Sequence, residues 1–267
     1  MVRLVTLLAV VSVSALSETG PLWEVRSSAV IGGSLIPAFY NGYLYSASPP
    51  NNLTLFAPDG RLSVNLLLQD HGNSKVNLMA VAVDADGSLA IGWKTQSNAG
   101  IDLHTPSGDL LRTIDTGRYE PAHLAFARDH ALWSFGRQRD AKDPSRSDKQ
   151  DYAMVRKYAT SGKEVGAYLA RSLFPAGLEP GMEAWQKHAL TITEDRVGIQ
   201  AYSGKMGSHQ EWVELDLEGN LMGRWNMDHI YEYPGVAFTS DDHAYVTGFD
   251  SETKIKHVFR LNYATGE

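Results

Sequence analysis

Polar side chains suited to metal binding or acid–base chemistry stand just before or at the start of several apolar runs in this sequence. They are Asn77, Glu120, His123, Glu183, His188 and Glu232. Carboxylate and amide oxygens are the ligands that Ca²⁺ and Mg²⁺ prefer, and imidazole would shift the preference towards Zn²⁺ or Mn²⁺. One hypothesis is that Asn77, Glu120 and Glu232 hold a single divalent cation, with Ca²⁺ as the candidate ion. The alternative is a water-filled channel lined by solvated polar groups.

Carboxylates from different units could also act as a pair. Glu120, Glu183 and Glu232 belong to three different repeat units and could converge, and a glycosidase needs two carboxyl groups that face each other at roughly 5–10 Å. The alternative is that the trio has no catalytic role, because any polar opening in a repeat protein would offer such carboxylates. The sequence has no Gly-x-Ser-x-Gly motif, so a nucleophilic serine of the α/β-hydrolase kind is not indicated.

Aromatic and polar residues near the same positions form a second candidate set, for ligand binding. An aromatic ring can stack on a sugar or an apolar ligand, and a neighbouring polar group can orient that ligand. The alternative is that the rings only pack the loops down. The set consists of Tyr119, His123, Glu183, Trp185, His188 and Tyr231.

The elements that must position these residues come from a repeat. In one set of segments an apolar-alternating run, a two-residue turn ending in Gly and a second run follow one another. The turn glycines are Gly60, Gly108, Gly162, Gly219 and Gly266. A second set interleaves with the first, with turns at 41–42, 86–87, 129–130, 195–196 and 241–242. Asn-Gly and Asp-Gly turns between runs of period two predict β-hairpins.

Each unit therefore contains two hairpins, or four strands, in about 45–55 residues, and five units fit the chain. This pattern predicts an all-β fold, a β-propeller with five four-stranded blades. The last unit ends in the turn before its outer strand, and residues 22–26 look like an orphan outer strand. We expect this N-terminal strand to complete the last blade and close the ring. A sixth blade, missing or merged with another, is the alternative.

The propeller assigns the loops to two faces. The hairpin turns lie on one face, and the remaining connections lie on the opposite face around the channel mouth. The two longest connections of this loop face, 137–152 and 171–187, flank the third unit. Residues 137–149 mix five basic with three acidic side chains, which predicts a solvated, mobile loop with a lesser chance of anion or partner binding.

Composition and the N-terminus restrict the possible functions. The chain carries 24 Lys and Arg against 31 Asp and Glu, a net charge of −7, which argues against a general nucleic-acid binder. It has no cysteine, so disulfides and thiolate chemistry are excluded. Residues 1–17 combine Arg3, an apolar run and small residues, as a secretory signal peptide does. We expect residues 18–267 to form one domain, secreted or periplasmic, with no stable membrane span after cleavage.

Two stretches resemble a known group of propellers. FAPDGRL at 56–62 and VAVDADGSL at 81–89 are similar to NHL-type repeats and to lactonase propellers of the gluconolactonase and senescence-marker type. The resemblance implies a propeller, usually six-bladed in those lactonases, with one divalent cation held by carboxylates and amides on the channel axis. The favoured function is a scaffold that binds a small molecule or a protein on its loop face. The alternative is a metal-dependent hydrolase of the lactonase type.

Overall fold

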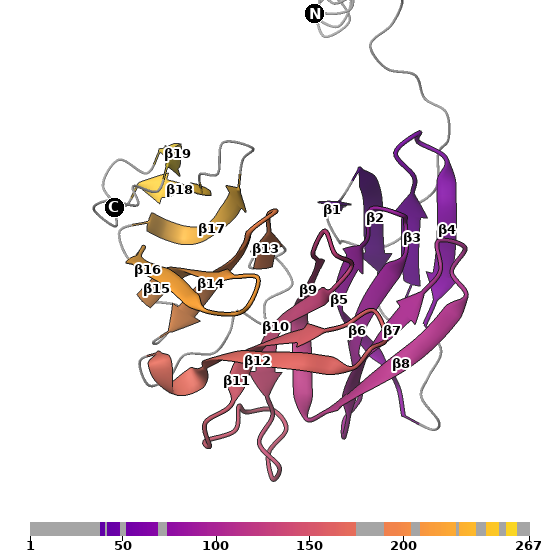
Figure 1. The fold of residues 1–267 in the computed structure, drawn as a ribbon, viewed down its shortest axis with the longest axis horizontal. Coiled ribbons are helices and arrows are strands. Elements are labelled where there is room, and N and C mark those ends of the chain that lie inside the picture. Colours follow the sequence, from indigo (N-terminus) through magenta and orange to yellow (C-terminus); the bar gives the residue numbers. More distant parts are fainter. Residues whose placement is uncertain are drawn as a thin grey trace, which may run out of the picture.

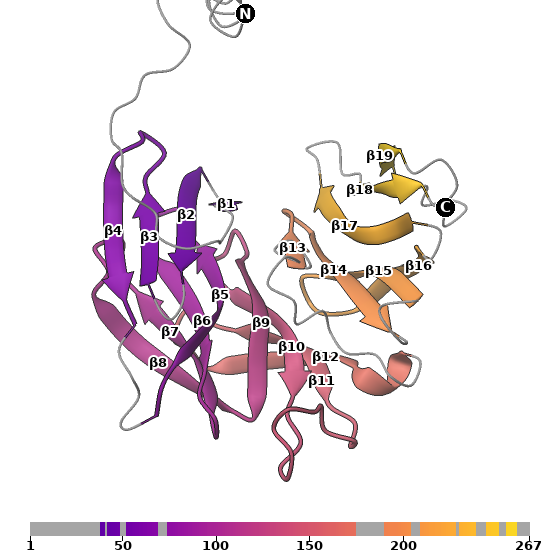
Figure 2. The ribbon, with the colours of Figure 1, turned by 180° about the vertical axis from the view of Figure 1, so that it is seen from behind.

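The computed structural model describes residues 38–40, 42–48, 52–68, 74–174, 190–203, 209–227, 230–238, 244–250 and 255–260. Within these ranges the chain forms five antiparallel sheets, which follow one another around the molecule in sequence order (Figures 1 and 2). A 3-10 turn at Arg171–Leu173 is the only helical element that they contain.

Each sheet is a meander of consecutive strands. The first contains β1 (Ala38–Tyr40), β2 (Tyr43–Ser48), β3 (Asn52–Phe56) and β4 (Leu62–Leu67). The second contains β5 (Asn77–Val83), β6 (Leu89–Lys94), β7 (Ala99–His104) and β8 (Leu110–Gly117). The third contains β9 (Tyr119–Phe126), β10 (Leu132–Gln138), β11 (Ala153–Tyr158) and β12 (Glu164–Ala170). The fourth contains β13 (Leu190–Ile192), β14 (Arg196–Ser203), β15 (His209–Asp216) and β16 (Leu221–Asn226). The fifth contains β17 (Ile230–Phe238), β18 (Ala244–Asp250) and β19 (Lys256–Arg260).

The first strand of a sheet is its innermost strand. Strand β9 contacts β5 and β13, and β13 contacts β17, so the first strands of consecutive sheets lie side by side. All of β9 except its last residue is buried, whereas the last strands β4 and β8 are mostly exposed. Such a radial arrangement of sequential four-stranded sheets is a β-propeller, as the repeat predicts. The orphan strand 22–26 and Gly266 lie outside the described residues, so ring closure stays a prediction.

The recurring hairpin turn explains the glycine spacing. Gly60, Gly108, Gly162 and Gly219 all have positive φ, and each donates its N–H to the carbonyl three residues earlier. A register shift sits beside each of these turns, in the pairs β3–β4, β7–β8, β11–β12 and β15–β16. The turn is a type I turn followed by a left-handed residue, so its loop holds three residues rather than the two expected. Glycine takes the last position because it adopts that conformation without steric cost.

Apolar side chains pack between neighbouring sheets. One cluster joins the first and second sheets through residues such as Leu55 and Ile91, and another joins the third and fourth through Trp133 and Val213. Trp133 is fully buried and stacks on Tyr168, with the ring centroids 5.4 Å apart. A sheet of this kind cannot bury both faces alone, so the stability of each blade depends on its neighbours.

A histidine links two of the hairpin turns, and its pH dependence can be predicted. His130 has a φ of 63° in the β9–β10 turn, and its Nδ1 lies 2.7 Å from the Asp84 carboxylate in the β5–β6 turn. The hydrogen bond with Asp84, and then the negative charge of Asp84, raises the pKa of His130. The nearby Asp86 and Asp129 add smaller effects in the same direction. A raised pKa means that the protonated histidine stabilises the fold below the unfolded-state pKa of about 6.5. This contribution is lost as the pH rises through the higher folded-state pKa.

We expect His130→Asn, which keeps a residue tolerant of positive φ, to lower the Tm more at pH 5.5 than at pH 9. Thermal melts of both proteins across this range measure the difference. A gap between the two melting temperatures that does not change with pH would show that the pair contributes no charge-dependent stability.

Candidate functional site

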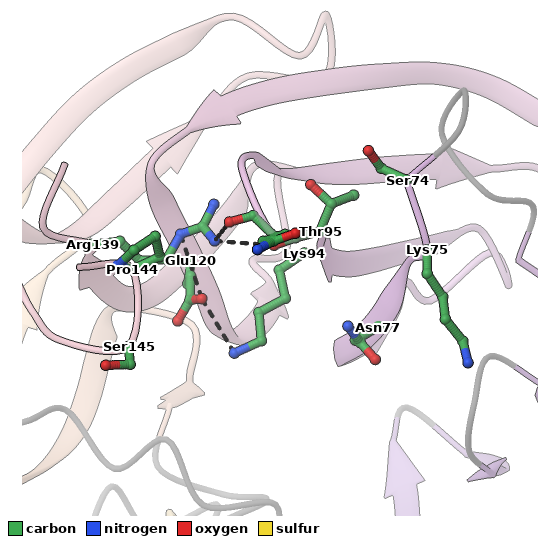
Figure 3. Close-up of a pocket in the computed structure, with 10 residues that line it drawn as sticks. Ser74, Lys75, Asn77, Lys94, Thr95, Glu120, Arg139, Pro144 and Ser145 are labelled. Carbon is green, nitrogen blue, oxygen red and sulfur yellow. Dashed lines mark hydrogen bonds and ion pairs between the residues drawn. The ribbon is translucent and has the colours of Figure 1, made fainter. Parts of the chain in front are cut away.

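A polar cavity of about 490 Å³ lies between the second and third sheets. The lining residues are Ser74, Lys75 and Asn77 at the start of β5, Lys94, Thr95 and Gln96 at the end of β6, Glu120 in β9, and Arg139, Pro144 and Ser145 after β10 (Figure 3). The lining residues lie in the connections that the repeat assigns to the loop face or at the adjoining strand ends, where Asn77 begins β5, Lys94 ends β6 and Glu120 is the second residue of β9. The cavity therefore lies where the propeller pattern expects function.

Glu120 is the charged centre of this cavity. Its side chain is 1% exposed, and three cations surround it. Lys94 Nζ lies 3.2 Å and Arg139 Nε 3.5 Å from Oε1, while Arg137 Nε donates a hydrogen bond of 2.9 Å to Oε2. The strand register explains the arrangement, because Arg137 is the partner of Glu120 across the β9–β10 pair. Positively charged groups beside both carboxylate oxygens thus compensate the buried negative charge of Glu120.

Arg139 joins the second sheet to the third. Its side chain is 3% exposed, and its Nη1 donates to the carbonyl oxygens of Thr95 (3.0 Å) and Gln96 (3.1 Å). Burial lowers the pKa of the Arg139 guanidinium, while the charge of Glu120 raises it. Arg137 and Arg118 lower it further. The sequence reasoning missed Arg139, although an arginine directly after an apolar strand at the loop face is a signal that could have found it.

The loop after β10 contains several internal hydrogen bonds. The backbone N–H of Asp140 donates to the carbonyl of Arg146 at 2.9 Å, and Arg118 donates to the Asp148 carboxylate at 2.9 Å. Arg139 also forms a backbone bridge with Ser147. Most side chains of the loop are exposed, as predicted for a solvated loop, whereas Arg139 and Ser147 are buried. The predicted mobility stays a prediction.

The structure does not favour the predicted cation site. Asn77 and Glu120 both line the cavity, but both oxygens of Glu120 already face lysine or arginine nitrogens. A divalent cation would have to displace those like charges, which is unfavourable. Nowhere in the described ranges do three or more His, Cys, Asp or Glu side chains gather in a group that could hold a metal ion. The side chain of Glu232, which lies in β17, is not described.

Two predicted ligand-binding residues are core residues instead. Tyr119 is fully buried; its hydroxyl donates to the Met154 carbonyl at 2.9 Å, and the Arg156 guanidinium lies 4.0 Å from its ring centroid. His123 is also buried and stacks on Phe135, with ring centroids 5.9 Å apart. Both lie on the almost wholly buried innermost strand β9. Their burial does not support the predicted ligand contacts, and for Tyr119 it fits the alternative that the ring only packs against the protein.

The other members of the predicted sets are not brought together by the described structure. Tyr231 and Glu232 lie in the backbone of β17, which pairs with β18. Glu183, Trp185 and His188 lie outside the described residues. Their roles as ligand or acid–base residues stay predictions, and so does the carboxylate trio with Glu120.

Comparisons with known proteins support the fold and give no information on function. No protein-family model and no curated protein sequence matches the chain. A protein from Lactobacillus plantarum of known structure has a TM-score of 0.52 at 13% identity, over 85% of this chain and 66% of that one. The Dos1 propeller has a TM-score of 0.48 at 12% identity, and the match covers 85% of this chain but only 56% of that one. BBS1N, solved in complex with ARL6DN, has a TM-score of 0.49 at 13% identity, over 85% and 69%.

None of the helices in the described ranges is long and apolar enough to cross a membrane. Residues 1–17, the predicted signal peptide, lie outside those ranges.

Proposed function

We propose that this chain is an exported β-propeller that binds a small polar ligand in the cavity beside Glu120. The observation that carries the proposal is the cavity itself, because about 490 Å³ falls within the usual range for small-molecule sites. Export rests on the predicted signal peptide of residues 1–17. A rigid scaffold with ligand contacts on its loops is the usual arrangement in such proteins.

The walls of the cavity are held in place before any ligand arrives. Strands β5, β6 and β9 form three sides, and Arg139 ties the β6–β7 turn to the loop after β10 through two hydrogen bonds. A site whose supporting groups are already ordered loses less conformational entropy on binding. The three cations around Glu120 do not support the alternative of a metal-dependent lactonase, so binding is the function that this geometry supports best.

A plug in the cavity tests the proposal. Gln96 lines the cavity and its side chain is exposed, so we expect Gln96→Trp to fill the space and abolish ligand binding. Ser97 is the next residue, is exposed and does not line the cavity, so Ser97→Trp is the matched control. A panel of neutral and charged small molecules is screened by thermal shift and confirmed by calorimetry. A ligand that binds both tryptophan variants as tightly as the unmodified chain does not occupy this cavity, and the proposal would then be wrong.

A further inference from the structure

The charges at the cavity do not balance. Among the described residues, Lys75, Lys94 and Arg139 line it with one carboxylate, Glu120, and Arg137 shares that carboxylate from one side. One negative charge therefore faces several positive ones, in a chain whose net charge is −7. A concave site that concentrates one sign of charge attracts ligands of the opposite sign.

The cations divide into a buried pair and an accessible pair. Arg137 and Arg139 are 12% and 3% exposed, and their hydrogen bonds hold the structure around Glu120. Lys94 is 29% exposed and has one partner, Glu120, within the described residues, although an ammonium group carries three N–H donors. Lys75 is exposed and has no hydrogen-bond or ion-pair partner in the described part of the chain. The lysines can therefore bind an incoming group without dismantling the arginine network.

The two lysines lie on the same side of the cavity. Asn77 is the register partner of Lys94 across the β5–β6 pair, so their side chains are neighbours. Lys75 precedes Asn77 by two residues, and both line the cavity while the intervening Val76 is buried. Figure 3 shows Lys94, Asn77 and Lys75 one after another along this side. Two ammonium groups with an amide between them provide donors that match an oxyanion.

The rest of the lining is hydrophilic. Ser74, Gln96 and Ser145 contribute polar groups, and Pro144 is the only apolar residue among those in the described part of the chain that line the cavity. Most side chains of the lining carry hydrogen-bonding groups, so a ligand with several polar groups can pair with them, and the aliphatic stems of the long side chains add some apolar surface. A small hydroxylated molecule that carries an anionic group fits both the charge and the polarity.

We propose that the ligand of this cavity carries an oxyanion, a carboxylate or a phosphate, which binds to Lys94 and Lys75 beside Asn77. The inference rests on the proposed function, because it names the ligand class of the same cavity. Free inorganic phosphate and a sugar that bears the anionic group are the two sources of this chemistry, and the experiment separates them.

Calorimetry on the full chain at low ionic strength uses four probes: glucose, glucuronate, glucose 6-phosphate and inorganic phosphate. The charged sugars are expected to bind and glucose is not. Binding by inorganic phosphate alone would identify the free anion as the source. Lys94→Met and Lys75→Met keep the apolar stems and remove the charges, and each is expected to weaken binding by about tenfold or more. Lys163→Met removes an exposed charge from a hairpin turn away from the cavity and is expected to leave binding unchanged.

The outcomes separate the inference from the proposed function. If the anions bind Lys94→Met and Lys75→Met as tightly as the unmodified chain, the inference is overturned. It is overturned as well if none of the four probes binds, or if glucose binds as tightly as its charged relatives. A neutral ligand that Gln96→Trp excludes would in those cases keep the proposed function while rejecting the oxyanion. Circular dichroism of each variant tests whether the lysine substitutions leave the fold intact.

Discussion

Replacing Glu120 with alanine is expected to lower the free energy of unfolding by about 3–5 kcal/mol, as breaking a buried ion pair does. The carboxylate is 1% exposed, and it offsets the charges of Lys94, Arg137 and Arg139. Without it, two buried guanidinium groups and a half-buried ammonium group face one another with no negative charge between them. Their mutual repulsion and their lost hydration then act without compensation.

Chemical denaturation of the purified chain measures this change, and thermal melting should show a Tm lower by on the order of 10 °C. Glu120→Gln retains the shape and one carbonyl oxygen, so we expect a smaller loss. The double variant Glu120→Gln with Lys94→Met should recover part of that loss, because it removes one of the unbalanced cations.

Glu194→Gln is the matched control. Glu194 also pairs with an arginine, Arg128, but the two side chains are 81% and 79% exposed. Exposed pairs contribute little to stability, so this variant should melt almost as the unmodified chain does. Equal effects of Glu120→Gln and Glu194→Gln would mean that the cluster around Glu120 is solvated and is not the fixed wall of a site.

Most of the fold could be predicted from the sequence because each hairpin is specified by residues that are close together in the chain. The turn that ends at Gly60, Gly108, Gly162 or Gly219 needs a left-handed residue, and the flanking strands alternate with period two. His130 occupies the same conformation in the β9–β10 turn, so the predicted turn at 129–130 is confirmed even without glycine. Each hairpin is therefore visible in about a dozen consecutive residues, and their repetition predicts the propeller.

The site could be predicted only in part, because its chemistry depends on residues that are distant in sequence. Glu120 was recognised as a polar residue at the start of an innermost strand, but its partners Lys94 and Arg139 come from the ends of other strands. A carboxylate alone suggests a cation ligand, whereas the same carboxylate among three cations is a counterion. Only the register of β9 with β10, and the packing of the second sheet against the third, decides between these roles.

The burial of Tyr119 could not be predicted for a related reason. A tyrosine at the beginning of a strand near a loop is exposed in a simple hairpin. Here strands β10 and β11 cover it: its hydroxyl contacts Ser134 and donates to the Met154 carbonyl, and Arg156 lies over its ring. The sequence pattern gives the position of the residue along the strand, but not what the neighbouring strands place over it.

Gly136→Ala is expected to lower the free energy of unfolding by about 1–3 kcal/mol or more, as overpacking in a filled interior does. A Cβ at this position would lie 2.0 Å from the carbonyl oxygen of Glu120 and 3.0 Å from Cζ of Tyr119. The nearest atom belongs to the backbone, so it cannot move aside as a flexible side chain would. The β9–β10 register shifts between Phe135 and Gly136, so the pairing of the two strands is irregular at this position.

The same substitution should also disturb the cavity, because the carbonyl that must move belongs to Glu120 itself. We therefore expect Gly136→Ala to weaken oxyanion binding, although Gly136 does not line the cavity. Gly117→Asn is the matched control: Gly117 has a φ of 62° and open space around its missing Cβ, and asparagine tolerates that conformation. Denaturation and calorimetry on both variants separate the effect of crowding, in Gly136→Ala, from the effect of replacing a glycine at positive φ, in Gly117→Asn. A Gly136→Ala protein as stable as Gly117→Asn would mean that β9 and β10 can separate without cost, and that the position of Glu120 is not set by their close pairing.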